Sequence, residues 1–143
     1  MSATATSEGR SFAGDRGALL VRAIRLDALV SGASGLLLAV GAPVLDGILG
    51  VSGAFLVGLG IVLLGYAGAL LSLDRMGAPT PGVKFVIAGN ALWALASVVA
   101  VLADWLTLTT TGIVVAVAQA AIVALLAEAQ LIGLRRRGQS TSL

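Results

Sequence analysis

The chain contains no cysteine and no histidine in its 143 residues. The absence of cysteine excludes disulfides, thiol nucleophiles and thiolate ligands of zinc or iron–sulfur clusters. The absence of histidine excludes an imidazole base and a histidine-ligated haem. No glycine-rich phosphate loop and no paired-carboxylate motif is present. We therefore expect no cofactor and no metal site, so any acid–base chemistry falls mainly to carboxyl groups.

Charged residues are also scarce, at 11% of the chain, and aromatic residues make up only 4%. Hydrophobic residues make up 58%, and the mean hydropathy is +1.04. A water-soluble domain of this length cannot cover its surface with so little charge, so the apolar excess requires lipid around it. Four runs reach the roughly 20 apolar residues that a spanning helix needs. They are approximately 26–45, 51–73, 85–103 and 113–134.

The basic residues all lie outside these runs and on one side of them. They precede the first run, separate the second from the third, and follow the fourth: Arg10, Arg16, Arg22, Arg25, Arg75, Lys84, Arg135, Arg136 and Arg137. The two other connectors carry only acid, Asp46 and Asp104. The positive-inside rule places the basic side in the cytoplasm. The same asymmetry accounts for the net charge of +2, so we expect no nucleic-acid partner.

These features predict an all-α membrane protein, a four-helix transmembrane bundle of up-down-up-down topology with its N and C termini cytoplasmic. The connectors are short, which makes consecutive helices antiparallel neighbours. We expect a disordered cytoplasmic tail over residues 1–16, the transmembrane domain over 17–137, and a loose C-terminal tail over 138–143. The helices are predicted at about 18–42, 51–73, 83–103 and 110–134.

Small residues recur at every fourth position of the predicted helices. Lipid offers no hydrophobic drive between helices, so close backbone contact has to hold them together. The first helix carries such a row in Ser31, Gly35 and Ala39, and the second carries Gly58 and Gly65 on one stripe. We interpret these rows as packing seams within one chain, with a homo-oligomer as the alternative.

Each predicted helix also carries a polar residue in its cytoplasmic half. At about 1.5 Å per residue, these positions lie roughly 9–12 Å inside the cytoplasmic helix ends. They are Ser31, Tyr66, Asn90 and Glu128, with Asp27 just nearer the interface on the Ser31 face. A polar group inside a membrane is costly, so this belt marks either a functional site or bonding between helices.

Glu128 stands out because only apolar residues lie one helical turn away on its own helix. Either it pairs with a group of another helix, such as Asn90 or Arg25, or it carries a proton at neutral pH. Gln130 lies at a similar depth but roughly 200° around the helix, so both cannot face one pocket. We predict that Glu128 faces the interior. The alternatives are that it only holds helices together or extends into the headgroups.

The candidate site therefore has two catalytic carboxyl groups, Glu128 and Asp27. Asn90, Tyr66 and Ser31 are predicted to orient the substrate, and Trp93, one turn after Asn90, forms an apolar wall. The alternative for Asp27 is an ion pair with Arg22 or Arg25 at the start of the helix, and for Trp93 it is simple space filling.

Several segments resemble a group of small bacterial integral membrane proteins from proteobacteria and actinobacteria. The most specific segment is Asn90–Ser97, with Asp27, Tyr66–Ala67 and Gly133–Arg136 in support, over roughly residues 22–137. The resemblance implies a four-helix fold in a bacterial inner membrane and a polar cluster of the Asp27, Asn90 and Glu128 kind, and it implies no activity. A comparison with small multidrug transporters fails, because their membrane carboxylate lies within the first helix among aromatic residues.

We consider three functions. The favoured hypothesis is a lipophilic small molecule bound in a cytoplasm-facing cavity inside the bundle, and isomerised or cyclised there by acid–base chemistry. The second is a small oligomeric transporter or proton-coupled exporter, which needs access from both faces although the outer half carries little polarity besides Gln119. The third is a structural or assembly partner of a membrane complex, with the polar belt holding helices together.

Overall fold

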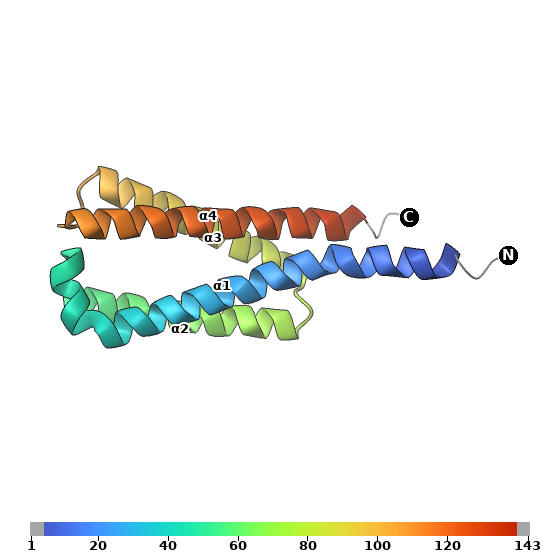
Figure 1. The fold of residues 1–143 in the computed structure, drawn as a ribbon, viewed down its shortest axis with the longest axis horizontal. Helices are drawn as coiled ribbons and strands as arrows, with labels where there is room; N and C mark the ends of the chain where they lie inside the picture. Colours follow the sequence, from blue (N-terminus) through green and yellow to red (C-terminus); the bar gives the residue numbers. More distant parts are fainter. Residues whose placement is uncertain (1–4, 140–143) are drawn as a thin grey trace.

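The computed structural model describes residues 5–139, and in that range it contains four helices and no strand. The helices are α1 (Ala5–Leu49), α2 (Gly53–Arg75), α3 (Thr80–Leu102) and α4 (Thr110–Gln139) (Figure 1). Each contains a segment that is long and apolar enough to cross a membrane; in α1 this segment is Gly17–Leu49. The predicted all-α, four-helix fold is confirmed, and it is the architecture of a multi-pass membrane protein.

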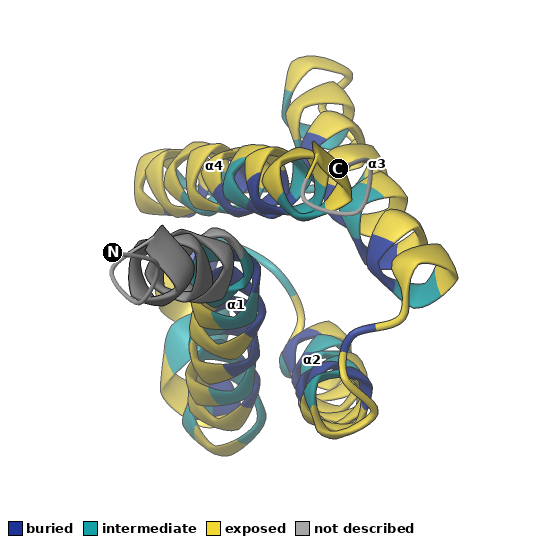
Figure 2. Ribbon diagram, turned by 90° about the vertical axis from the view of Figure 1, so that its right-hand side faces the viewer, coloured by how far each residue is buried: buried dark blue, intermediate teal, exposed yellow. Residues whose placement is uncertain are grey.

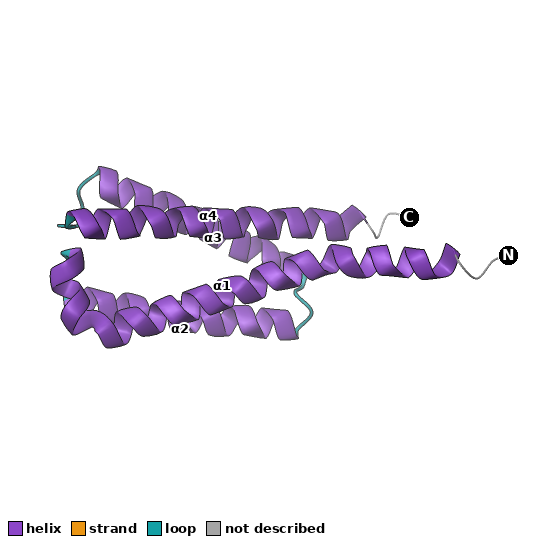
Figure 3. Cartoon of the chain, in the orientation of Figure 1, coloured by secondary structure: helices purple, strands orange, loops and turns teal. Residues whose placement is uncertain are grey.

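The connectors lie at alternate ends of the bundle, so that consecutive helices run antiparallel (Figure 3). The start of α1 and the end of α4 consequently lie at the same end (Figure 1). The helices pair as two hairpins, α1 with α2 and α3 with α4, and the hairpins meet mainly where α1 packs against α4. Helices α2 and α3 hardly touch, although they are neighbours in sequence (Figure 2).

Helix α1 is longer than predicted at both ends. It begins at Ala5, so residues 5–16 continue the helix in place of the predicted disordered tail, while residues 1–4 lie outside the described residues. Extending an existing helix needs no new nucleation, and residues 5–16 contain no proline. At its other end α1 passes through Pro43 and bends in this region (Figure 1). Gly50, with φ of +81°, follows its last residue.

Helix α4 also runs past its predicted end and reaches Gln139, so residues 138 and 139 are helical. Residues 140–143 of the predicted loose tail lie outside the described residues. Helices α2 and α3 agree with their predicted ranges within a few residues at each end.

The seam between α1 and α2 is built on two glycines that face each other. A Cβ atom at Gly35 would lie 2.7 Å from the carbonyl oxygen of Gly60, and a Cβ atom at Gly60 would lie 2.6 Å from the carbonyl oxygen of Gly35. The small-residue row of α1 is therefore a packing seam within the chain. The row predicted on α2 is wrong, because Gly58 and Gly65 have no neighbour within 4 Å of such a Cβ atom.

The two hairpins are joined at both ends of the bundle. At the α3–α4 loop, the Thr109 backbone N–H donates to the carbonyl oxygen of Leu49 at 3.0 Å, and Gly112 lies directly against that carbonyl. At the opposite end, a Cβ atom at Gly133 would lie 2.9 Å from the backbone nitrogen of Leu20. Only glycine allows such close backbone contact, so α1 and α4 are held together at these two points.

The surface outside these seams is apolar. Large hydrophobic side chains of every helix are exposed, and exposed residues cover the outer faces of the ribbon (Figure 2). The larger of two clusters of buried hydrophobic residues in the described part of the chain lies near the α2–α3 loop and consists of Leu20, Ile24, Ala28, Leu70, Leu73, Ala78, Val83 and Val86. The hydrophobic side chains thus occupy the exposed faces as well as the buried clusters, and such a surface suits contact with lipid rather than with water.

Candidate functional site

Four polar side chains, one from each helix, surround the carboxyl group of Asp27. Together with Asp27 they form a group that we call the Asp27 cluster, and it consists of Asp27, Ser31, Tyr66, Asn90 and Gln130. Asp27 is only 1% exposed and Gln130 is 0% exposed. The two are joined across 103 positions of sequence. The cluster therefore ties the first helix of the chain to the last one.

Asp27 accepts hydrogen bonds through both of its carboxyl oxygens. The Asn90 Nδ2 and Gln130 Nε2 groups each donate to Oδ2 at 2.7 Å, and the Ser31 hydroxyl donates to Oδ1 at 3.2 Å. Tyr66 has one proton, which it donates to Asn90 Oδ1 at 2.8 Å; its 3.4 Å distance to Asp27 Oδ2 is longer. Each member of the cluster therefore has a partner, and Asp27 is the common acceptor.

No basic side chain approaches Asp27 among the described residues. Arg25, which we had considered as its partner, donates from Nε to Asp74 Oδ2 at 2.8 Å on the bundle surface. The alternative interpretation of Asp27, an ion pair at the start of the helix, is therefore wrong. The carboxyl group is held by neutral donors alone.

Glu128 does not belong to this cluster, which corrects the prediction that it faces the interior. Its side chain is exposed on the outer side of α4, and no hydrogen bond or ion pair reaches it from the described residues. Gln130, roughly 200° away around the helix, is buried in its place. The prediction that Glu128 faces the interior was based on the cost of placing a charge in the membrane. A carboxylate on the outer face avoids that cost by extending toward the headgroups.

One sequence signal does distinguish Gln130 from Glu128. The buried positions of α4 include Ala127 and Gly133, small residues that lie roughly 60° from Gln130 but roughly 100° or more from Glu128 around the helix. Small residues in a membrane helix mark the face that contacts other helices. The helical position of Gln130 relative to them, rather than the chemistry of its side chain, identifies it as the inward residue.

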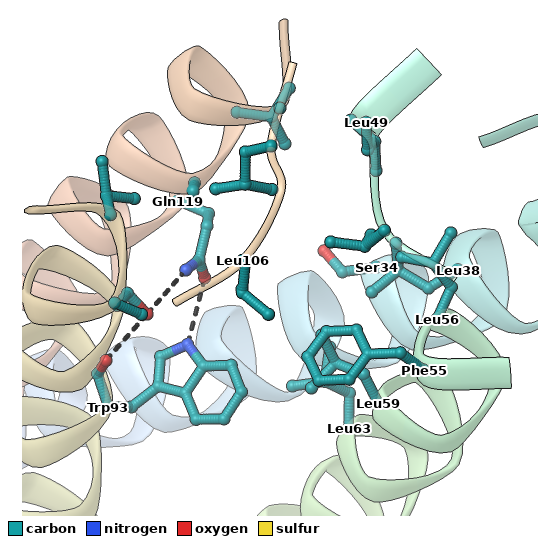
Figure 4. Close-up of a pocket in the computed structure, with 18 of the residues that line it drawn as sticks. Ser34, Leu38, Leu49, Phe55, Leu56, Leu59, Leu63, Trp93, Leu106 and Gln119 are labelled. Carbon is teal, nitrogen blue, oxygen red and sulfur yellow. Dashed lines mark hydrogen bonds between the residues drawn. The ribbon is translucent and has the colours of Figure 1, made fainter. Parts of the chain in front are cut away.

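Trp93 is held by a second, separate set of hydrogen bonds. Its indole N–H donates to Gln119 Oε1 at 3.1 Å, and Gln119 Nε2 donates to the Ser97 hydroxyl at 3.0 Å. Ser97 in turn donates to the Trp93 carbonyl at 2.8 Å. These three hydrogen bonds form a closed ring that joins α3 to α4. They hold the indole ring of Trp93 so that it points into the space between the hairpins (Figure 4). Trp93 thus lines the space between the hairpins, and its role as the wall of a ligand pocket stays a prediction.

Two adjoining cavities occupy the space between the hairpins. The cluster cavity, about 330 Å³, is lined by Ser31, Tyr66 and Asn90 together with apolar side chains such as Phe85. The loop cavity, about 370 Å³, lies toward the α3–α4 loop and has an almost wholly apolar lining that includes Phe55 (Figure 4). The two cavities share four lining residues: Ser34, Leu63, Trp93 and Gln119.

The cavities lie where α2 and α3 fail to meet. Both are lined by residues of α2 and of α3, yet these helices make almost no contact. Phe85, in the lining of the cluster cavity, is 82% exposed. The opening therefore faces sideways, between two membrane helices, which differs from the predicted cytoplasm-facing cavity. Asp27 and Gln130 do not line either cavity, because they lie behind Ser31, Tyr66 and Asn90.

The structure thus brings together five of the six residues predicted for the site and leaves one outside. Asp27, Ser31, Tyr66 and Asn90 share one hydrogen-bonded cluster, and Trp93 borders the same cavity. Chemically, the arrangement offers a long apolar space with hydroxyl and amide groups at one end and a buried carboxyl group behind them. No family model, curated protein or solved structure matches this chain.

Proposed function

We propose that this protein is a multi-pass protein of a bacterial inner membrane that binds a lipophilic small molecule between its two hairpins. The observation that carries the proposal is the pair of adjoining apolar cavities with the polar side chains of the Asp27 cluster at one end. Ligand sites are typically apolar cavities of several hundred Å³ with a few converging polar groups. A molecule with a long apolar part and one polar end matches that arrangement.

The access route is lateral, from the bilayer. The hairpins are joined at both ends by the contacts of Thr109 with Leu49 and of Gly133 with Leu20. Between these ends, α1 packs against α2 and α4, and α3 packs against α4. Helices α2 and α3 hardly touch, so the described part of the bundle is open on the side between them. This arrangement supports a ligand that is already dissolved in lipid, and it favours binding over the transport alternative, which needs an opening at each end of the bundle.

A chemical step, if the ligand is isomerised or cyclised, would involve Tyr66 first. Tyr66 lines the cluster cavity, whereas Asp27 is 1% exposed and outside the lining. Asp27 therefore acts as a positioning residue for Tyr66 and Asn90 rather than as the group that meets the ligand. Glu128, on the outer face, has no part in this proposal.

The orientation can be tested directly, because the chain has no cysteine of its own. We propose the basic end as cytoplasmic. Met76→Cys, in the α2–α3 loop and 68% exposed, should react with a membrane-impermeant maleimide only after the cells are permeabilised. Trp105→Cys, in the α3–α4 loop and 72% exposed, should react in intact cells. The reverse pattern would contradict the proposed orientation.

Ligand binding can be followed through the fluorescence of Trp93. The chain has two tryptophans, so Trp105→Phe leaves Trp93 as the only reporter, and Trp93→Phe leaves Trp105 on the surface as its matched control. In nanodiscs, brominated long-chain compounds should quench Trp93 saturably, because they occupy the cavity beside it. They should quench Trp105 only in proportion to their concentration in the bilayer.

A variant that fills the cavity completes this test. A Cβ atom at Gly89 meets nothing within 4 Å, and Gly89 lines the cluster cavity, so Gly89→Leu should fill part of it without disturbing the helix. We expect this variant to weaken the saturable quenching of Trp93 at least about tenfold, since the ligand loses the space beside Tyr66. Non-saturable quenching of Trp93, equal to that of Trp105, would refute the proposed function.

A further inference from the structure

Taking the cavity as a ligand site, as proposed above, we infer that its ligand is a lipophilic amine, whose ammonium group donates hydrogen bonds to Tyr66 and Ser31. This assignment follows from two features of the Asp27 cluster. One is the direction of its hydrogen bonds, and the other is that no basic side chain among the described residues pairs with the carboxyl group of Asp27.

Two hydroxyl groups at the polar end of the cluster cavity, those of Ser31 and Tyr66, present acceptors. The Ser31 hydroxyl uses its only proton on Asp27 Oδ1, and the Tyr66 hydroxyl uses its own on Asn90 Oδ1. The Asn90 amide group donates to Asp27 and to Gln130 Oε1. Ser31 and Tyr66 line the cavity, and because their protons are directed into the cluster, their hydroxyl oxygens keep lone pairs for a ligand.

A ligand that meets these two oxygens has to donate. An ammonium group carries three donors and no acceptor, whereas a carboxylate accepts only and would face oxygen lone pairs. Turning either hydroxyl toward an anionic ligand would break its bond to Asp27 or to Asn90 and leave a buried acceptor without its donor. The direction of the bonds therefore selects against acidic lipids.

The buried carboxyl group of Asp27 favours a positively charged ligand over a neutral hydrogen-bond donor. Asp27 is buried among neutral donors, and the nearby Arg25 is engaged with Asp74. An ammonium at Tyr66 would lie one side chain away from the carboxyl group, in a setting of low dielectric constant where opposite charges attract strongly. An alcohol of the same chain length makes a similar hydrogen bond but lacks this attraction.

The experiment compares three probes of one chain length: dibrominated oleylamine, oleyl alcohol and oleate. Each is titrated into phosphatidylcholine nanodiscs that hold the Trp105→Phe protein, with saturable quenching of Trp93 as the readout. We expect the amine to bind at least about tenfold more tightly than the alcohol, and oleate to bind most weakly.

Two variants separate the buried charge from the surface charge. Asp27→Asn keeps an acceptor for Asn90 and Gln130, and it should reduce the preference for amine over alcohol to less than about threefold. The amine loses its hydration shell equally on binding to the parent protein and to Asp27→Asn. The change in the preference for amine over alcohol between these two proteins is therefore free of that cost. Glu128→Gln removes a carboxylate from the exposed face of the same helix bundle and should leave the preference unchanged.

The outcomes are distinguishable. Saturable binding of all three probes with equal strength, tightest binding of oleate, or a preference for amine that survives in Asp27→Asn would overturn the inference and leave the cavity as a ligand site. Loss of the preference in Glu128→Gln would assign it to surface attraction and would also overturn the inference. If no probe quenches Trp93 saturably, the proposed function fails together with it.

Discussion

Replacing Asp27 with leucine is expected to lower the free energy of unfolding by about 2–4 kcal/mol. The substitution removes two bonds to other helices, each about 0.6 kcal/mol on average in a membrane protein, and leaves the Asn90 and Gln130 amides without their shared acceptor. Relief from burying a carboxyl group offsets little of this loss, because the unfolded helices are also embedded in lipid. The quantity is measured by reversible titration with dodecyl sulfate in mixed micelles.

Two companion variants make this prediction specific to hydrogen bonding. Asp27→Asn retains an acceptor oxygen and should stay within about 1 kcal/mol of the parent protein. Adding Gln130→Leu to Asp27→Leu should cost less than the sum of the two single changes, because the second change removes an orphaned amide. A leucine variant as stable as the parent would show that the Asp27 cluster does not hold the helices together.

Replacing Gly60 with leucine is expected to cost about 3 kcal/mol or more. A Cβ atom at this position would lie 2.6 Å from the Gly35 carbonyl oxygen and 2.7 Å from the Ala39 backbone nitrogen. Neither is the end of a flexible side chain, so α1 and α2 would have to move apart along their seam. The same dodecyl sulfate titration measures the loss, with circular dichroism to check that helix content is kept.

Gly58 provides the matched control on the same helix. A Cβ atom there meets nothing within 4 Å, so Gly58→Leu adds an apolar side chain that faces lipid. Leucine also favours the helix by somewhat less than about 1 kcal/mol relative to glycine. We expect this variant to be as stable as the parent or slightly more so. Equal destabilisation by both leucines would mean that the Gly35–Gly60 contact is not a tight seam.

The fold could be predicted from the sequence because its main determinants are local. Run length and hydropathy define four spans, and short connectors force antiparallel neighbours. The helix ends were less predictable. The first helix, predicted to end near residue 42, continues through Pro43 to Leu49, because a membrane helix tolerates a proline where it can bend.

The site was predicted in part because it depends on rotation about each helix axis. Asp27, Tyr66 and Asn90 were found from their polarity alone, since no other polar side chain competes with them at that depth of their helices. On α4 two polar residues competed, and Glu128 was chosen for its charge although Gln130 faces inward. Likewise Gly60, rather than Gly58, forms the seam of α2. Both errors concern which face turns inward, and that depends on contacts between helices.

The bond between Asp27 and Gln130 bears on how the chain is assembled during synthesis. Asp27 lies in the first helix and Gln130 in the last, so the growing protein inserts its carboxyl group into the bilayer long before this partner leaves the ribosome. Until then, Ser31 on the same helix, Tyr66 on the second and Asn90 on the third are the donors at hand. A product truncated before α4 would retain a carboxyl group in its first helix that lacks the Gln130 donor, so its first three helices would be less firmly held than in the complete chain.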